Sequence, residues 1–153
     1  MIRVQVLTIG RVQGSDDYLL VLREVDGERL LPITIGEFEA RAIERAARGV
    51  VPARPGTHDL LAAVVQRLGG VLERAIIHDL RDETFFCQLE LQGGRGLLEV
   101  DCRTSDAVAL ALRSDSPVYA TEDVLRKAAV LPHQGVVEPA PEDADADGST
   151  ESE

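Results

Sequence analysis

The sequence predicts an α+β fold, a compact single domain of two antiparallel β-meanders with intervening and following helices. Two groups of three segments alternate apolar and polar residues as strands do, and helical patterning separates and follows these groups. The 153 residues are enough for one hydrophobic core without disulfide or metal support. With 44% hydrophobic and 28% charged residues, the composition is that of a globular domain rather than of a disordered or collagen-like chain.

The first meander is expected in the N-terminal quarter of the chain. Period-two alternation with a polar turn after the first strand and an Asp-Gly turn after the second predicts the strands Arg3–Ile9, Tyr18–Val25 and Arg29–Ile35. The apolar spacing then changes to the helical period, and Gly and Pro mark the ends. Two helices are therefore expected, one over Glu37–Arg48 and one that Thr57 caps and that ends at the Gly69-Gly70 pair.

The second meander and its helices fill the rest of the domain. Strands are predicted over Val71–Leu80, Thr84–Leu91 and Leu97–Arg103, followed by a largely buried helix, Ser105–Ser114. An extended segment, Pro117–Ala120, precedes a last helix, Glu122–Ala129, that Thr121 should cap. We expect the domain to span residues 1–132. Residues 133–153, rich in Pro, Ala, Asp, Glu, Ser and Thr, are predicted to form a disordered acidic tail.

Charge and composition exclude several classes of protein. The net charge is −11, but seven of the 27 acidic residues follow His133, so the body of the chain is only mildly acidic. Aromatic residues make up 3%, too few for the stacking platforms of single-strand binders. No signal-like or membrane-spanning apolar run is present, so we expect a cytoplasmic protein with no membrane partner. Cys87 and Cys102 lie on apolar strand faces, which predicts two buried reduced thiols.

One carboxylate of the first predicted helix is out of place. Helical phase puts Phe38 and several alanines in an apolar arc, and Glu37 and Arg41 on the polar side. Glu39 falls in the middle of the apolar arc. A carboxylate there is costly unless it is hydrogen-bonded, bound to a cation or protonated. Glu39 is therefore either a functional residue or one half of a structural pair with an Arg or a backbone amide.

Two more polar segments lie where helices begin. His58 lies at the edge of the apolar arc of the second helix. This position fits three roles: a metal ligand, a general base, or a histidine that makes an ordinary hydrogen bond. The arc itself comprises Leu60, Leu61, Val64, Val65 and Leu68. Asp101, Arg103 and Asp106 surround a strand-to-helix junction. Such residues can ligate a divalent cation and position a phosphate, and a capping network with an Asp-Arg pair explains them equally.

These segments resemble, in order and spacing, the motifs of the bifunctional nuclease domain family. The matching stretches are Leu31–Ala40 (LPITIGEFEA), Arg54–Leu61 (RPGTHDLL) and Asp101–Ala111 (DCRTSDAVALA), and the similarity covers about residues 1–130. The resemblance implies a compact α+β domain, often dimeric, with plant relatives described as acting on DNA and RNA. The polar residues at matching positions are Glu39, His58, Asp59, Asp101, Arg103, Ser105 and Asp106. The sequence departs from the usual pattern at Thr104, where Pro is common, and at Gly56, where a larger apolar residue is common.

The resemblance leads us to expect a nuclease that hydrolyses phosphodiester bonds of DNA or RNA with a divalent metal. Glu39 with Asp101 or Asp106 would bind Mg²⁺ or Mn²⁺, His58 would activate water, and Arg103 would stabilise the charge that develops on the phosphate. Nucleic acid and a second copy of the chain are the expected partners. The main alternative is a non-catalytic regulatory or partner-binding domain in which the motifs determine folding. A binder of a small anionic metabolite at the helix that begins near Ser105 is a third possibility.

Overall fold

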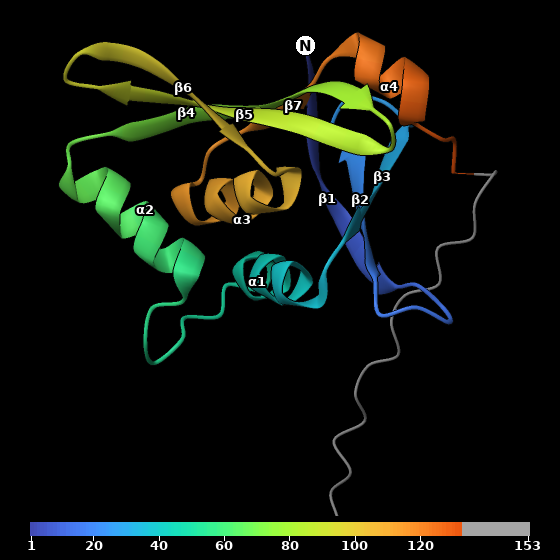
Figure 1. Cartoon of the computed structure of the whole chain (residues 1–153), viewed down its shortest axis with the longest axis horizontal. Coiled ribbons are helices and arrows are strands. Elements are labelled where there is room, and N and C mark those ends of the chain that lie inside the picture. Colours follow the sequence, from blue (N-terminus) through green and yellow to red (C-terminus); the bar gives the residue numbers. More distant parts are fainter. Residues whose placement is uncertain (133–153) are drawn as a thin grey trace, which may run out of the picture.

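The N-terminal strands form the meander that their alternation predicts. The computed structural model describes residues 1–132, in which β1 (Ile2–Arg11), β2 (Tyr18–Glu24) and β3 (Leu30–Ile35) pair antiparallel in chain order (Figure 1). Alternate residues such as Leu20, Leu22 and Ile33 are almost completely buried. The predicted acidic tail, residues 133–153, lies outside the described residues.

The second meander comprises β4 (Val71–Arg81), β5 (Thr84–Gly93) and β6 (Gly96–Cys102). Asp82 and Glu83 between the first two strands both have positive φ, at 48° and 64°, the backbone of a two-residue hairpin turn. A short strand, β7 (Val118–Ala120), pairs antiparallel with β1 and parallel with β4. It thereby joins the two meanders into one seven-stranded mixed sheet of order β3-β2-β1-β7-β4-β5-β6. The predicted α+β class and both meanders are confirmed.

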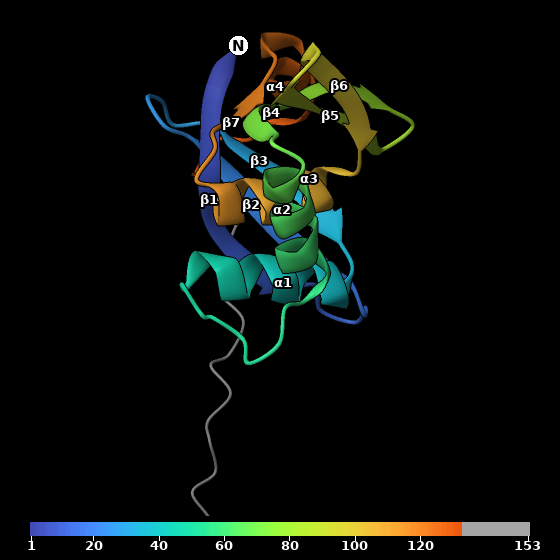
Figure 2. The ribbon, with the colours of Figure 1, turned by 90° about the vertical axis from the view of Figure 1, so that its left-hand side faces the viewer.

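Four helices complete the domain: α1 (Glu37–Ala47), α2 (Thr57–Arg67), α3 (Thr104–Ser114) and α4 (Glu122–Ala128). Helix α3 is largely buried, as its apolar sequence predicts, and packs against α1, α2, β4 and β5. Figures 1 and 2 show α1, α2 and α3 on one side of the second meander, with α4 on the other. As predicted, the Thr121 side chain caps α4 by accepting a hydrogen bond from the Val124 N–H (3.3 Å). No helix of residues 1–132 has the length and apolarity needed to cross a bilayer.

Two predictions about apolar helix faces are wrong. Phe38, placed in the apolar arc of α1, is 84% exposed. The predicted core arc of α2 is uncovered as well, since none of the residues of this helix is buried in the described chain and Leu68 is 82% exposed. The reason is position: α2 packs mainly on α3 and has few contacts with β4, so no other described element buries its apolar side.

Candidate functional site

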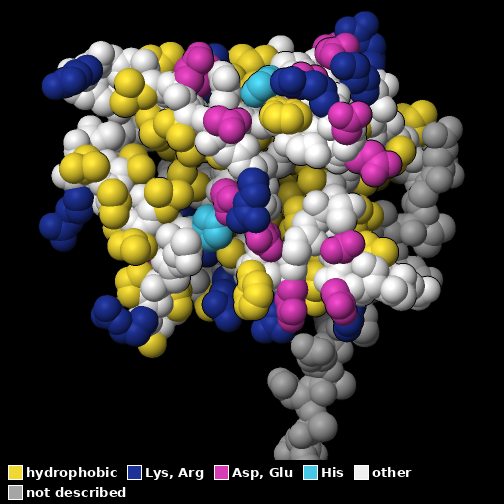
Figure 3. All heavy atoms as spheres, viewed as in Figure 1, with side chains coloured by type: hydrophobic (Ala, Val, Ile, Leu, Met, Phe, Trp, Pro, Cys, Tyr) yellow, Lys and Arg dark blue, Asp and Glu magenta, His cyan; other side chains and the backbone are white. Residues whose placement is uncertain are grey.

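The candidate site lies where three helices begin. Gly36, Gly56 and Arg103 are the N-cap residues of α1, α2 and α3, and none of them caps its helix with a side chain. The first turns carry Glu39, His58 and Asp106, the residues singled out in the sequence. Because α3 packs between the other two helices, their polar first turns come together at its N-terminal end. In Figure 3 a histidine, a basic side chain and acidic side chains lie next to one another in the middle of this face.

Arg103 bridges two carboxylates from different helices. Its Nε donates to Asp106 Oδ2 at 2.7 Å and its Nη2 to Asp106 Oδ1 at 3.1 Å, while Nη1 donates to Glu39 Oε1 at 2.9 Å. The guanidinium side chain is 66% exposed, but Glu39 is only 20% exposed. These hydrogen bonds raise the pKa of Arg103, with the bond to Asp106 contributing most. The carboxylate that helical phase placed among apolar residues is thus paired with an Arg whose own charge faces solvent.

His58 is the inner member of the same network. Its Nε2 lies 2.8 Å from Asp106 Oδ1, and the histidine side chain is 12% exposed. Burial acts to raise the pKa of Asp106, but the hydrogen bonds to Arg103 and His58 outweigh it and lower that pKa below its ordinary value. Asp106 is therefore a carboxylate near neutral pH. A neutral His58 that donates from Nε2 to this carboxylate has Nδ1 as its proton-accepting nitrogen.

Asp59 belongs to a separate, structural pair. Its Oδ1 accepts from Arg113 Nε at 2.7 Å and its Oδ2 from the Gly56 N–H at 2.8 Å, and both bonds lower the pKa of Asp59. Arg113, 13% exposed, also donates to the backbone carbonyls of Ala109 (2.8 Å) and Ala42 (3.1 Å). One guanidinium therefore ties α1, α2 and α3 together. Sequence reasoning missed the Asp59 pairing, for which the only signal was a basic residue in an otherwise apolar helix.

Asp101 does not join the network. Its side chain is exposed on β6 and has no hydrogen bond or ion pair with any described residue. Thr104 and Ser105, at the start of α3, are buried. The Thr104 hydroxyl oxygen has no hydrogen-bond partner in the described structure. The first residue of α3 therefore carries a buried and unsatisfied polar group.

The residues expected to bind a metal do not fit a divalent cation as they are arranged. Residues 1–132 contain no group of three or more His, Cys, Asp or Glu side chains placed to hold one. Glu39 and Asp106 share the Arg103 guanidinium, which occupies the place that a cation between the two carboxylates would take. Asp101, the third expected ligand, lies apart.

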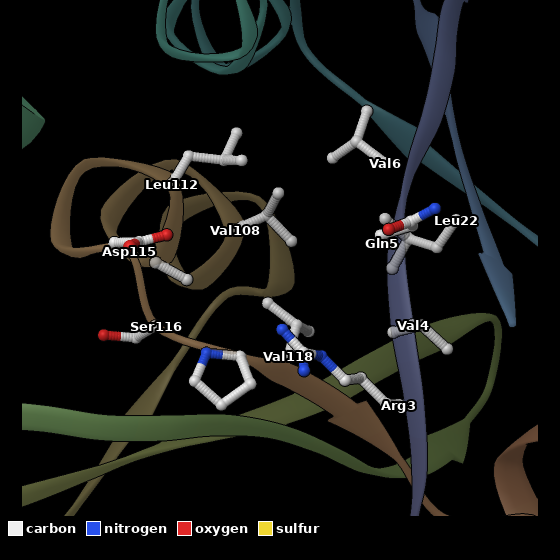
Figure 4. A pocket seen from close by; sticks show the side chains of 12 residues that line it. Arg3, Val4, Gln5, Val6, Leu22, Val108, Leu112, Asp115, Ser116 and Val118 are labelled. Atoms are coloured by element: carbon white, nitrogen blue, oxygen red, sulfur yellow. The ribbon is translucent and has the colours of Figure 1, made fainter. Parts of the chain in front are cut away.

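A cavity of about 250 Å³ lies elsewhere, between β1 and the C-terminal end of α3 (Figure 4). Apolar side chains, among them Val6, Val108 and Val118, form much of its wall, and Arg3 and Asp115 lie at its edge. No residue of the Arg103 network lines it. The candidate functional site, at the N-termini of the three helices, is therefore separate from this cavity.

Fold and site together define an α+β domain with a mixed seven-stranded sheet and a surface network of two carboxylates, a histidine and an arginine. The model of the bifunctional nuclease domain matches residues 20–133, and the chain belongs to this family. It is also similar to the uncharacterized proteins Rv1829 of Mycobacterium tuberculosis strain H37Rv and MT1877 of strain CDC 1551. Each is 41% identical over 128 residues, which is 84% of this chain and 76% of the relative. The family points to a nuclease-related function.

Proposed function

We propose that this protein hydrolyses phosphodiester bonds of DNA or RNA at the network of Glu39, His58, Arg103 and Asp106. The observation that carries the proposal is the 2.8 Å contact between His58 and Asp106 beside an arginine that is 66% exposed. A histidine oriented by a carboxylate is suited to accept a proton, and an exposed guanidinium is suited to bind a phosphate. Membership of the bifunctional nuclease domain family supports the same class of reaction.

Each residue has a role that follows from its contacts. Arg103 binds the phosphodiester, and Glu39 and Asp106 fix the direction of its guanidinium. His58 accepts the proton of the attacking water at Nδ1, while Asp106 holds Nε2 and stabilises the imidazolium that forms. The water oxygen bonds to phosphorus, one P–O ester bond breaks, and the departing oxygen takes up a proton from solvent, which leaves a phosphate monoester and a free hydroxyl. Arg103 offsets the charge that builds up on the phosphoryl oxygens.

The test is hydrolysis of labelled DNA and RNA by highly purified protein. Removing the general base with His58→Gln should lower the rate by about 100-fold or more. Arg103→Lys loses the two-pronged contact with Asp106 and should weaken substrate binding. Glu37→Gln is the matched control, because Glu37 lies in the same helix as Glu39 but pairs with Arg41 outside the network, and it should cleave like the wild type. Equal rates in all four proteins would reject this site.

Mg²⁺ or Mn²⁺ dependence stays a prediction from the sequence, and a chelator arm of the same assay tests it. Loss of cleavage with chelator and its return with Mn²⁺ would support a metal-dependent reaction. Unchanged cleavage would support the metal-free roles given above. A folded protein that cleaves neither substrate, with or without either metal, would favour the alternative, a non-catalytic regulatory or partner-binding domain.

We also propose that two copies of the chain associate through what we call the α2–β6 apolar face. This face comprises the exposed residues Leu60, Leu61, Val64, Leu68, Leu98 and Val100. Figure 3 shows hydrophobic side chains gathered over α2 and the neighbouring end of the second meander. Monomeric domains rarely leave apolar surface of this extent uncovered. An amphipathic helix without one buried residue is explained if a second copy covers it.

Analytical ultracentrifugation tests the dimer. Val64→Glu places a charge in the middle of the apolar arc of α2 and should give a monomer. Gln66→Glu adds the same charge on the opposite side of the helix and should leave the dimer intact. A wild-type chain that sediments as a monomer at micromolar concentration would contradict the proposal.

A further inference from the structure

The two cysteines of the chain lie directly opposite each other on neighbouring strands. Cys87 of β5 and Cys102 of β6 are partners in the antiparallel register, so their side chains leave the sheet on the same face. Both are free thiols. Facing Cα atoms of an antiparallel pair are about 4.5 or 5.5 Å apart, and disulfides span roughly 4.4–6.8 Å. The backbone therefore already has the separation that a cross-strand disulfide needs.

We propose that Cys87 and Cys102 form an oxidative modification site, at which a hydroperoxide converts the two thiols into a cross-strand disulfide. Exposure distinguishes the two sulfurs. Cys87 is fully buried, whereas Cys102 is half-buried and precedes the exposed Arg103. A small oxidant therefore reaches Cys102 first, and Cys87 is the residue that completes the reaction.

The reaction takes place in two steps. The Cys102 thiolate attacks one oxygen of hydrogen peroxide, the O–O bond breaks, and Cys102 becomes a sulfenic acid as hydroxide leaves and is protonated to water. Cys87 then attacks the Cys102 sulfur, an S–S bond forms, and a second hydroxide leaves and takes the Cys87 proton as water. The two thiols lose two electrons in total, and the peroxide is reduced to two molecules of water.

The position of the disulfide connects it with the candidate site. Cys102 is the last residue of β6, and Arg103, the next residue, holds Glu39 and Asp106. A covalent bond at this point fixes the end of an edge strand to β5 directly before the N-cap of α3. The inference does not rest on the proposed nuclease activity, because it follows from the register of two strands alone.

The experiment is titration of the reduced full chain with hydrogen peroxide. We expect both free thiols to disappear with a loss of two hydrogen atoms in the intact mass, and with no covalent dimer on a non-reducing gel. Peptide mapping of the oxidised wild type should recover the segments of Cys87 and Cys102 as one linked species, a readout that needs no variant.

Two variants test the order of the steps. Cys87→Ser should stop at a sulfenic acid on Cys102, which dimedone traps, and Cys102→Ser should keep its one thiol unmodified under the same peroxide dose. A covalent dimer through Cys102, or over-oxidation of Cys102 while Cys87 remains a thiol, would overturn the proposal. So would oxidation of the denatured chain under conditions that leave the native chain unchanged.

Discussion

Removal of the Thr104 hydroxyl should stabilise the protein. Thr104 is 4% exposed and its Oγ1 has no hydrogen-bond partner among the described residues. A buried polar group without a partner costs about 1–3 kcal/mol, and Thr and Val differ little in shape or helix propensity. We therefore expect Thr104→Val to raise the free energy of unfolding by about 1 kcal/mol. For a domain of this size that corresponds to a rise in melting temperature of roughly 2–4 °C.

Thr104→Pro should act in the same direction for a second reason. Thr104 is the first residue of α3, where Pro is well tolerated because its missing N–H has no helical partner. The preceding residue, Arg103, has φ −72° and ψ 145°, the extended backbone that a residue before Pro prefers. The ring removes freedom from the unfolded chain, which adds about 0.4–1 kcal/mol.

The assay is urea and thermal unfolding followed by circular dichroism, with Thr121→Val as the matched control. The Thr121 hydroxyl does have a partner, the Val124 N–H, so the same substitution there should lower the free energy of unfolding by about 1 kcal/mol. The expectation is that the two substitutions change the free energy of unfolding in opposite directions. A Thr104→Val protein less stable than the wild type would refute it, because the hydroxyl would then have a stabilising partner.

The other predictions concern the charged pairs and the tail. Arg113→Met should lower the free energy of unfolding by about 2 kcal/mol, because it leaves the partly buried Asp59 without its arginine. Arg41→Met, at an exposed pair with Glu37, should lower it by less than about 0.5 kcal/mol, and thermal unfolding measures both. Glu39→Gln should change stability or cleavage more than the exposed Glu37→Gln, and equal, negligible effects would contradict its assignment to the network. The pKa values of Asp59 and Asp106 are lowered in the folded state, so the unfolded chain binds more protons in acid. These two groups therefore stabilise the fold above about pH 4, and this stabilisation is lost as the pH falls through their pKa values in the folded state. In acid titrations followed by fluorescence-based thermal melts, Asp106→Asn should flatten this loss. Truncation after His133 should leave the melting temperature unchanged, since the removed residues have little to bury, and a large drop would show that the tail docks.

The local sequence was enough to predict the elements of the fold and the first turns of its helices. Apolar alternation predicts both meanders, and helical phase identifies Glu39 as a carboxylate that needs a partner. The identity of that partner was open, because Arg103 lies 64 residues further along the chain. The contact of His58 with Asp106 spans 48 residues and depends on how α2 packs against α3. Such pairings follow from tertiary packing, which one sequence does not specify.

The wrong prediction that the apolar arc of α2 is buried has a different physical origin. An apolar arc indicates that a helix has a side to bury, but it does not indicate that the same chain supplies a cover. Leu60 and Leu68 repeat at helical spacing as core residues do, yet no other element of residues 1–132 buries them. Phe38 illustrates the same limit in α1. The amphipathic pattern therefore predicts which helix surface is apolar, but it does not predict which element, if any, packs on that surface.

The shortness of β7 has a consequence for how the chain is assembled during synthesis. Three residues, Val118–Ala120, provide all the pairing that links β1 to β4. These three residues come after both meanders in the chain. When residues 1–114 have left the ribosome, the strands of both meanders are present but the strand that joins them is not. Each half then has an additional unpaired strand edge, β1 in one half and β4 in the other, which is a template for pairing with other chains. The synthesis of β7 thus allows two open-edged sheets to become one, and in the interval before it the additional edges are exposed to aggregation.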